Sequence, residues 1–363
     1  MRIHLLFSLL YLISFSTLGQ IVLVDNQHKT SIAFAHVISE SGNLIATSNL
    51  DGLIKLDSIC KLKNHSFIIQ HLSYENKELT YEELTAGDTI FMYGKNYILP
   101  DVLVSTSKQE VVVLKGYYRS YELDDNVPKF YSDGIVKYYI PLANEKKIKM
   151  ELIEHRSYGN NILIEKEKQR ANMIVMRLAG IPRIGYNSIL EALEKKYSTG
   201  NLSLNYADII KDTSVVGKIQ WDVEDNTIQL NLDFIAPKQS ETKTFFNYTS
   251  QILNNELIEI YPNVELSELS LKDLLRRKNY RKILFKHKKD NDSVKLEGVN
   301  ELYIFDRSYI SKKEFKQINS SSYAFPESTS YTNEYWKTLG QYNIPATNRN
   351  VDHLIGKILT KYQ

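Results

Sequence analysis

Strict alternation of apolar and polar residues on both sides of one turn is the feature that most restricts how this chain can fold. Residues 217–237 read GKIQWDVEDNTIQLNLDFIAP, with a polar turn at 224–227. The apolar side chains occupy every second position on the two arms: Ile219, Trp221 and Val223, then Ile228, Leu230, Leu232 and Phe234. Because successive side chains of a strand point to opposite faces of its sheet, this period of two predicts an antiparallel hairpin with one face in the core. The 25 tyrosines favour further sheet, since tyrosine suits half-buried pleated surfaces.

The first 19 residues have the pattern of an export signal. Arg2 provides a positive start, an uncharged apolar run covers residues 5–15, and small residues precede Gln20. This pattern predicts a secretory signal peptide, residues 1–19, with a retained anchor helix as the alternative. No later stretch of sequence is long and apolar enough to predict a transmembrane helix. We therefore expect a protein that is periplasmic, associated with the outer membrane, or secreted.

An exported chain of this composition must be stable without internal disulfides, because Cys60 is its only cysteine. The 363 residues are enough for two domains of ordinary size, each with its own core. Cys60 lies between Ile59 and Leu62, which predicts a small buried hydrophobic side chain rather than a nucleophile.

One segment concentrates positive charge, although the formal net charge of the whole chain is only +2. Residues 272–290 read KDLLRRKNYRKILFKHKKD, with little acid among the cations. The residues that we select for contact with an anionic surface are Arg276, Arg277, Lys278, Arg281, Lys286 and Lys288. Export argues against nucleic acid as the partner and favours an anionic envelope component, such as lipid headgroups or lipopolysaccharide phosphates. The alternative is structural: a solvated helix end, followed by an edge strand that lysines protect from pairing.

Short apolar segments separated by turn-forming residues predict a sandwich of strands in the first domain. Strand candidates cover residues 21–24, 35–38, 44–47 and 53–56, and further ones follow before residue 95. Gly52 stands where the chain reverses into the last of these four. A turn of this kind needs a residue at positive φ, which glycine adopts without steric cost.

A spaced pattern over residues 21–106 extends this prediction. Its members are Ala35, Val37, Thr47, Gly52, Leu56, Tyr74, Leu99, Val102 and Val104. The pattern resembles the carboxypeptidase-regulatory-like, transthyretin-type β-sandwich that exported proteins of the Bacteroidetes type often carry at their N-termini. Ser73 stands where that family has a glycine before the tyrosine. The resemblance implies a structural docking module without catalytic residues, in which Gly52 shapes a hairpin and does no chemistry.

Tyrosines dominate the start of the second domain. Residues 116–142, GYYRSYELDDNVPKFYSDGIVKYYIPL, predict a β-meander with turns at 124–126 and 132–134. Its tyrosines, with one tryptophan, are the candidate ligand-binding residues: Tyr117, Tyr118, Tyr121, Tyr138, Tyr139 and Trp221. One interpretation is an aromatic platform for a glycan or another flat ligand, and the other is cross-strand packing within a large antiparallel sheet.

Helical signals predict the elements that flank this sheet. One helix is expected within residues 163–178, and a second begins after Asn187 or Ser188 and ends before Gly200. The tail from residue 329 predicts a short helix, a crossing segment that contains a proline, and a final amphipathic helix from about Asn350.

The motifs of common catalytic and metal chemistry do not occur in the sequence. It contains no H-E-x-x-H, no histidine followed by glutamate three residues later, no G-x-S-x-G and no P-loop. We therefore expect no metal, no cofactor and no catalytic residue. A pair of carboxylates that meets only in the folded protein stays open as an alternative. The acidic runs at 124–125 and 222–225 fall in predicted turns, which explains them without chemistry.

The sequence as a whole predicts a mainly β protein. An N-terminal transthyretin-like β-sandwich, residues 20–106, precedes a larger α+β domain, residues 107–363, with an antiparallel sheet and flanking helices. The predicted function is non-catalytic binding or scaffolding in the cell envelope, with the sandwich as docking module and the second sheet meeting a ligand or partner. Two alternatives stay open: an envelope glycan or peptide hydrolase that uses a carboxylate pair, and a lipid carrier with a half-barrel sheet.

Overall fold

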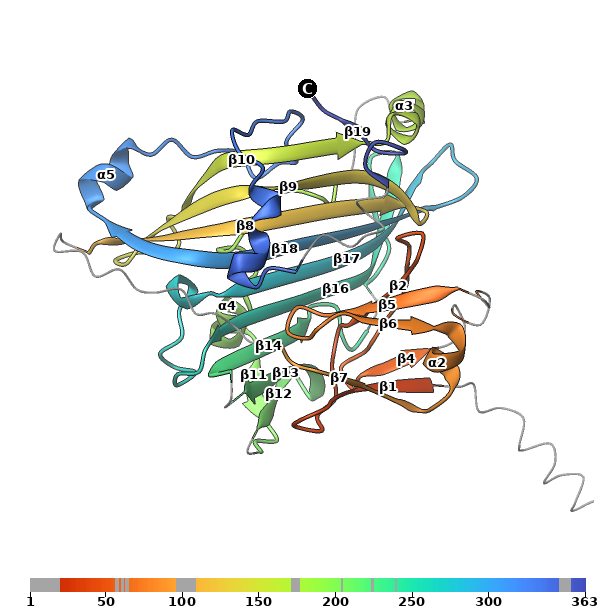
Figure 1. Cartoon of the computed structure of the whole chain (residues 1–363), viewed down its shortest axis with the longest axis horizontal. Helices are drawn as coiled ribbons and strands as arrows, with labels where there is room; N and C mark the ends of the chain where they lie inside the picture. Colours follow the sequence, from red (N-terminus) through yellow and green to blue (C-terminus); the bar gives the residue numbers. More distant parts are fainter. Residues whose placement is uncertain are drawn as a thin grey trace, which may run out of the picture. The chain divides into compact units, whose positions relative to one another are not determined.

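The computed structural model describes residues 20–55, 59, 62, 65–95, 109–170, 177–203, 205–222, 225–238, 240–345 and 354–363. The protein is mainly β, with antiparallel sheets and few helices, as the sequence predicted (Figure 1). The chain divides into two compact units, Met1–Lys95 and Asn96–Gln363. The predicted signal peptide, Cys60 and the predicted boundary after residue 106 lie outside the described residues. In the part of the chain that the structure describes, no helix combines the length and the apolar character needed to cross a membrane.

The first unit consists of two sheets that share one apolar core. In one sheet β1 lies between β4, its antiparallel neighbour, and β7, its parallel neighbour. The other sheet has the order β3-β2-β5-β6. Ile21 and Leu23 of the first sheet pack with Val37, Phe67 and Ile69 of the second, so the two sheets form a sandwich. The elements are β1 (Gln20–Asp25), β2 (His36–Ser39), β3 (Leu44–Thr47), β4 (Leu53–Lys55), β5 (Ser66–Gln70), β6 (Lys77–Thr80), α2 (Tyr81–Thr85) and β7 (Thr89–Met92).

Gly52 lies in the turn between β3 and β4, and the positive φ predicted for it is confirmed at +73°. A Cβ at this position would lie 2.6 Å from the carbonyl oxygen of Leu23 and 3.1 Å from the backbone nitrogen of Ile32. The N–H of Leu23 donates to the carbonyl oxygen of Gly52 at 2.8 Å. The glycine therefore serves both the turn and the close approach of β1, which the sequence did not indicate.

The second unit is built on one large antiparallel sheet of 12 strands, in the order β11-β12-β13-β14-β16-β17-β18-β8-β9-β10-β19, with β15 paired to β16. The predicted hairpin is confirmed as β13 and β14, in which Trp221 pairs with Ile228. β8 lies between β9 and β18. The strands are β8 (Val111–Asp124), β9 (Val127–Pro141), β10 (Lys149–Gly159), β11 (Ser198–Gly200), β12 (Tyr206–Lys211), β13 (Ser214–Asp222), β14 (Thr227–Asp233), β15 (Lys243–Phe245), β16 (Tyr248–Pro262), β17 (Arg276–His287), β18 (Val294–Ile310) and β19 (Thr360–Lys361).

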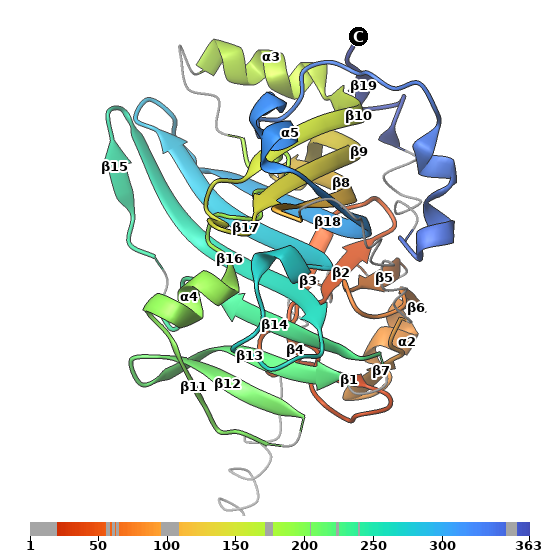
Figure 2. The ribbon, with the colours of Figure 1, turned by 90° about the vertical axis from the view of Figure 1, so that its left-hand side faces the viewer.

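One face of this sheet, the apolar face, is covered by segments of the same unit. The helix α4 lies against β14 (Figure 2), and its cap is as predicted: the Oγ of Ser188 accepts a hydrogen bond from the N–H of Glu191 at 3.1 Å. Ile189 of α4 and the segments 181–184 and 269–274 contribute buried residues to the core on this face. The remaining elements are α3 (Asn161–Arg170), α4 (Ile189–Lys195), η2 (Leu271–Asp273), α5 (Lys312–Gln317), η3 (Tyr335–Lys337) and η4 (Leu339–Tyr342).

The predicted turn at 132–134 is wrong, because these residues lie in the middle of β9 and pair with β8 and β10 on both sides. A Cβ on Gly134 would overlap the carbonyl oxygen of Glu154 and would lie 2.8 Å from Cε1 of Tyr118. The glycine thus makes room for its neighbours within the sheet instead of bending the chain.

Three further predictions concern a turn and two helices of the second unit. The turn at 124–126 is confirmed as the short connection between β8 and β9. The helix predicted within 163–178 is confirmed up to Arg170, where α3 ends and residues outside the description begin. The final helix was predicted to begin outside the described residues. Leu354, where the described residues resume, is helical, and nearer the end the chain forms β19, because Thr360 and Lys361 pair with β10.

Replacing Gly52 with alanine tests the role of this turn. We expect Gly52→Ala to lower the free energy of unfolding of the first unit by about 1–3 kcal/mol, because the substitution strains the backbone and crowds β1. Gly87→Ala is the control, since a Cβ there meets no atom within 4 Å. Hydrogen exchange of the β1 and β4 amides reports on this unit directly. Equal protection in the two variants would contradict the assignment.

Candidate functional site

One row of register partners across the second sheet, called here the charged row, is polar at every position except Ile258. Each member is the register partner of the next: Asp208, Lys218, Asn231, Ile258, Lys278, Glu301, Arg119, Asp133 and Arg156. Directly paired residues of antiparallel strands project from the same face, which we call the polar face. From Lys278 to Arg156 the sign of the charge alternates, and all five side chains are buried. Each buried cation therefore has a carboxylate on a neighbouring strand.

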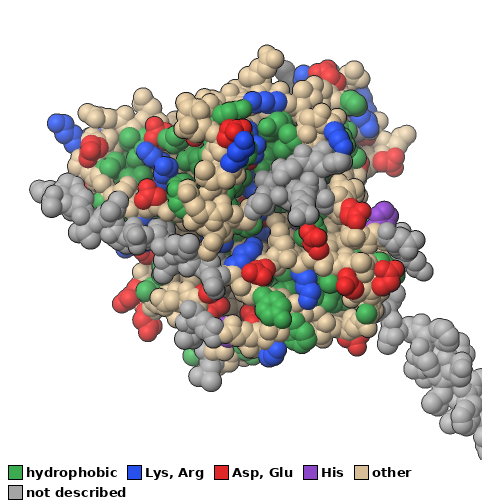
Figure 3. Space-filling model, in the orientation of Figure 1, with side chains coloured by type: hydrophobic (Ala, Val, Ile, Leu, Met, Phe, Trp, Pro, Cys, Tyr) green, Lys and Arg blue, Asp and Glu red, His purple; other side chains and the backbone are tan. Residues whose placement is uncertain are grey.

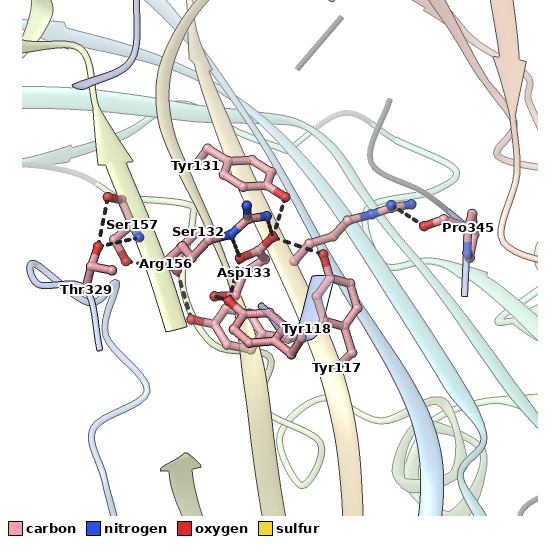
Figure 4. Close-up of polar contacts among 11 residues, drawn as sticks. Tyr117, Tyr118, Tyr131, Ser132, Asp133, Arg156, Ser157, Thr329 and Pro345 are labelled. Carbon is pink, nitrogen blue, oxygen red and sulfur yellow. Dashed lines mark hydrogen bonds and ion pairs between the residues drawn. The ribbon is translucent and has the colours of Figure 1, made fainter. Parts of the chain in front are cut away.

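The Asp133 carboxylate is the most fully satisfied member of the row (Figure 4). Arg156 donates to it with two nitrogens, Nε to Oδ1 at 2.9 Å and a terminal nitrogen to Oδ2. Three tyrosine hydroxyls also donate: Tyr131 at 2.9 Å and Tyr117 at 3.2 Å to Oδ2, and Tyr335 at 2.7 Å to Oδ1. Asp133 itself has no exposed surface. A buried charge is tolerated when it is paired and fully hydrogen-bonded, as this one is.

The neighbouring groups of the row hold one another in their charged forms. Burial alone would raise the pKa of Glu301, but the Arg119 guanidinium, aided by Lys278, brings it below its ordinary value. Burial would lower the pKa of Arg156, but the hydrogen bonds and charge of Asp133 raise it overall. Arg119 with Glu301 and Arg156 with Asp133 therefore form two buried ion pairs, while burial lowers the pKa of Lys278 to about 8.

A crossing segment, residues 330–345 and called here the strap, runs over the polar face (Figure 1, dark blue). It agrees with the proline-containing crossing segment that the sequence predicted. At its start, His155 and Ser330 exchange backbone hydrogen bonds of 2.7 and 3.0 Å. At its end, a guanidinium nitrogen of Arg119 donates to the carbonyl oxygen of Pro345 at 3.0 Å. The strap is thus fixed at both ends to strands β8 and β10.

The middle of the strap is attached to the charged row itself. The hydroxyl of Tyr335 donates to the backbone oxygen and to Oδ1 of Asp133. Burial and the Asp133 charge together raise the pKa of this hydroxyl, so Tyr335 keeps its proton and remains a donor. The guanidinium of Arg156 lies 3.9 Å from the ring centroid of Trp336, a cation–π contact. The ion pair therefore positions two consecutive aromatic side chains of the strap.

A pocket of about 310 Å³ opens between the strap and strands β8, β9, β10 and β18. Its aromatic wall is formed by Phe305 and Tyr342, stacked with centroids 4.4 Å apart. Phe305 lies where the pairing register of β18 shifts between Ile304 and Asp306. The Nζ of Lys115 lies 5.7 Å from the centroid of Phe305. The residues that line this pocket include Lys115, Glu154, Phe305, Glu334, Tyr335 and Tyr342.

Two carboxylates line this strap pocket, and both are engaged in holding the strap. Oε1 of Glu154 accepts hydrogen bonds from the hydroxyl and N–H of Thr332 and from the N–H of Asn333. These bonds, the Thr332 hydroxyl first, lower the pKa of Glu154. Glu334 pairs with Lys337 at 2.6 Å, and its side chain is 54% exposed. A general acid at neutral pH needs a raised pKa, whereas the pKa of Glu154 is lowered and Glu334 is held in an ion pair.

The six aromatic residues selected from the sequence do not form one surface. Tyr118 and Tyr138 are buried in the core on the apolar face, with Trp221 partly buried at its margin. Tyr117 donates to Asp133, and its polar-face neighbour Tyr121 is partly buried. The sixth, Tyr139, packs in a separate small cluster with Val111 and Val113. The structure therefore divides them between the two faces of the sheet, and Tyr118 and Tyr138 serve packing.

The basic segment begins at the end of the short 3-10 helix η2, but most of it forms β17, which is not an edge strand because it lies between β16 and β18. Arg276, Arg277 and Lys278 are buried, which removes them from contact with a surface. Arg277 forms an ion pair with Glu259. Of the other selected cations, Arg281 and Lys286 are partly buried and Lys288 is exposed. On the face drawn in Figure 3, charges of both signs are interspersed among the described residues.

Sequence reasoning missed Asp133 and Arg156, the centre of the polar face. Ser132-Asp133-Gly134 has the composition of a turn, which concealed a strand interior. The usable signal is that the period of two continues through it, since Tyr131, Asp133 and Ile135 lie on one face of β9. Nothing local indicates Tyr335, whose role depends on a partner 202 residues away.

Comparison with known proteins does not assign the chain to a family. No protein-family model matches the chain, and no curated protein matches it. Among the described residues, no group of histidine, cysteine, aspartate or glutamate is arranged to hold a metal ion.

Removal of one hydroxyl tests the attachment of the strap. We expect Tyr335→Phe to destabilise the second unit by about 1–3 kcal/mol, because Asp133 loses a buried donor. The emission of Trp336, measured in a Trp221→Phe background, should shift to longer wavelength as the strap loosens. Tyr331→Phe is the control, since its hydroxyl accepts from the exposed Lys361 and the substitution keeps the ring that packs against Trp336. An unchanged spectrum for Tyr335→Phe would show that the strap is held elsewhere.

The charge of Asp133 can be tested separately. We expect Asp133→Asn to cost about 3–5 kcal/mol of unfolding free energy, because Arg156 is left as a buried charge without its carboxylate. The double variant Asp133→Asn with Arg156→Met should recover part of this loss. Chemical denaturation followed by circular dichroism measures both, with the exposed Asp212→Asn as control. A loss below 1 kcal/mol for Asp133→Asn, by the scale of ordinary surface substitutions, would refute the role assigned to the pair.

Proposed function

We propose that the chain is an exported, non-catalytic binding protein of the cell envelope, and that the second unit holds its ligand in the strap pocket. The single observation that carries this proposal is the combination, in one pocket, of a stacked aromatic pair and the cation Lys115. Export is supported by the signal-peptide pattern of residues 1–19. The first unit would serve as a docking module, which its resemblance to the carboxypeptidase-regulatory-like sandwich supports.

The pocket chemistry favours a ligand with one flat apolar face and one anionic group. Phe305 and Tyr342 offer ring surface for such a face. Lys115 offers three donors and a positive charge for a carboxylate or phosphate next to it. A volume of about 310 Å³ is at the small end for ligand pockets and suits one sugar unit or a molecule of similar size. An acidic sugar unit of an envelope glycan has both chemical features.

The carboxylates of the pocket favour binding over hydrolysis. A glycosidase needs one carboxyl group that is protonated near neutral pH and a second that faces the scissile bond. Glu154 instead has a lowered pKa and is occupied by the strap, and Glu334 is paired with Lys337. Both residues therefore contribute to the shape of the pocket.

The apolar face favours the same proposal over a lipid carrier. A half-barrel carrier would leave the apolar side of its sheet for the acyl chains. Here α4 and residues 181–184 and 269–274 pack their own side chains against that side, among them Ile184 and Leu274 with no exposed surface. The pocket under the strap, with its aromatic and charged lining residues, is the better candidate for a ligand.

Calorimetric titration with a short galacturonate oligosaccharide tests the proposal, with maltotetraose as the neutral probe. We expect the galacturonate to bind and Lys115→Met to weaken binding at least tenfold, the effect of about 1.5–3 kcal/mol for a charged hydrogen bond. Lys137→Met is the matched control, because Lys137 pairs with Lys115 across the sheet but does not line the pocket.

Two results would contradict the proposal. Equal binding of the acidic and neutral probes, or equal loss in Lys115→Met and Lys137→Met, would remove the strap pocket as the site. Release of shorter sugars that stops in Glu154→Gln and Glu334→Gln would favour the hydrolase instead.

A further inference from the structure

Phe246, at the tip of the β15–β16 hairpin, has both an exposed aromatic side chain and a strained backbone. Phe245 pairs with Tyr248, so Phe246 and Asn247 form the turn between the two strands. The Phe246 side chain is 92% exposed. Its φ of +51° lies in the left-handed region, where a bulky side chain is strained. A large apolar side chain in water and a strained backbone both cost free energy, and residues of this kind concentrate at functional sites.

A stack of rings behind the turn supports it. Tyr248 stacks on Phe285 with centroids 5.0 Å apart and contacts the edge of His287 at 4.8 Å. The N–H of Lys288 donates to the carbonyl oxygen of Asn247 at 2.7 Å, which joins the β17–β18 connection to the hairpin. Figure 2 shows this hairpin and this connection reaching outward at the same end of the sheet. The exposed ring is therefore presented on a rigid support.

Charged residues accompany the exposed ring on the hairpin and on the neighbouring connection. The cations are Lys243, Lys286, Lys288 and Lys289. The carboxylates of the same segments are Glu241, Asp290 and Asp292. The backbone N–H of Lys288 is bonded to the turn, and Asp290 and Asp292 follow further along the connection. Four lysines thus accompany three carboxylates on these segments, and the side chains of Lys243, Lys288 and Lys289 are exposed.

Two further apolar side chains are exposed at the same end of the strands, on the edge of the sheet that is formed by strand ends and their connections. Val127, 42% exposed, begins β9, and Ile162, 82% exposed, follows the end of β10 in α3. They share the edge with Phe246 because β17 and β10 end there and β16, β18 and β9 begin there. A protein interface has a contiguous apolar core. Separate apolar side chains along one edge, with lysines beside the largest, fit a flat and deformable surface better.

We propose that this edge of the second unit docks onto a lipid surface with anionic headgroups. Phe246 enters the interfacial region as an apolar anchor, and Lys243, Lys288 and Lys289 contact the headgroups. The lysine stems can lie along the apolar boundary while their ammonium groups stay among the phosphates. Of the cations that the sequence predicted for contact with an anionic surface, Lys288 takes part in this docking. The apolar anchor, Phe246, was not indicated by the sequence. It does not depend on the strap pocket.

Co-sedimentation of the purified protein with vesicles tests the docking. The vesicles contain equal parts of phosphatidylglycerol and phosphatidylcholine, or phosphatidylcholine alone. We expect binding to the anionic vesicles and at least a tenfold loss in Phe246→Gly, the effect of removing one buried aromatic side chain. Lys288→Glu with Lys289→Glu should lower binding to the anionic vesicles and make the remainder insensitive to salt.

The glycine variant separates docking from folding. Because glycine adopts a positive φ without strain, Phe246→Gly should keep or raise the midpoint of thermal unfolding while it loses vesicle binding. Leu202→Ser is the matched control, since Leu202 is also an exposed apolar residue, at 80%, on the β11–β12 connection. The proposal is overturned if the unchanged protein ignores both vesicles, as expected for a protein partner at this edge. It is equally overturned if Phe246→Gly binds normally or Leu202→Ser loses as much binding.

Discussion

Five donor groups converge on the carboxylate of Asp133 inside a sheet, two from Arg156 and one each from three tyrosines. They come from β8, β9, β10 and the strap, so the carboxylate is satisfied only when all four elements are in place. A shift of β9 by one residue would carry Asp133 to the apolar face, and a shift by two would separate it from Arg119 and Arg156. The ion pair therefore defines the register of the central strands, a specificity that apolar packing alone does not provide.

The strap and its pocket follow from this register. Tyr335 donates to Asp133, and Trp336 packs on Arg156. Both contacts require that the Asp133–Arg156 ion pair lies beneath the strap. Glu154 then receives Thr332 and Asn333, which sets the rim of the pocket. A rigid ion pair in the sheet thus positions a segment that has little regular structure of its own. Binding sites are commonly built this way, from irregular segments held by a rigid scaffold.

The sequence predicts those parts of the fold that depend on neighbours in the chain. The β13–β14 hairpin, the cap at Ser188 and the positive φ of Gly52 each follow from a few consecutive residues. The interior position of β17 could not be predicted, because its charges are balanced by carboxylates of β16 and β18. For the same reason the candidate site was largely missed: Lys115 and Tyr342 of the strap pocket come together only through the tertiary fold.

The position of β8 has a consequence for how the chain is made. Its Ser120 hydrogen-bonds Asn300, which is 180 residues later in the chain. During synthesis, β8 and β9 can pair at once, but the other edge of β8 stays open until β18 arrives. Long-range strand pairing is slow, and an open strand edge invites association with other chains. A holding chaperone that covers the open edge of β8 would therefore help this protein more than it would help a protein built from sequential hairpins.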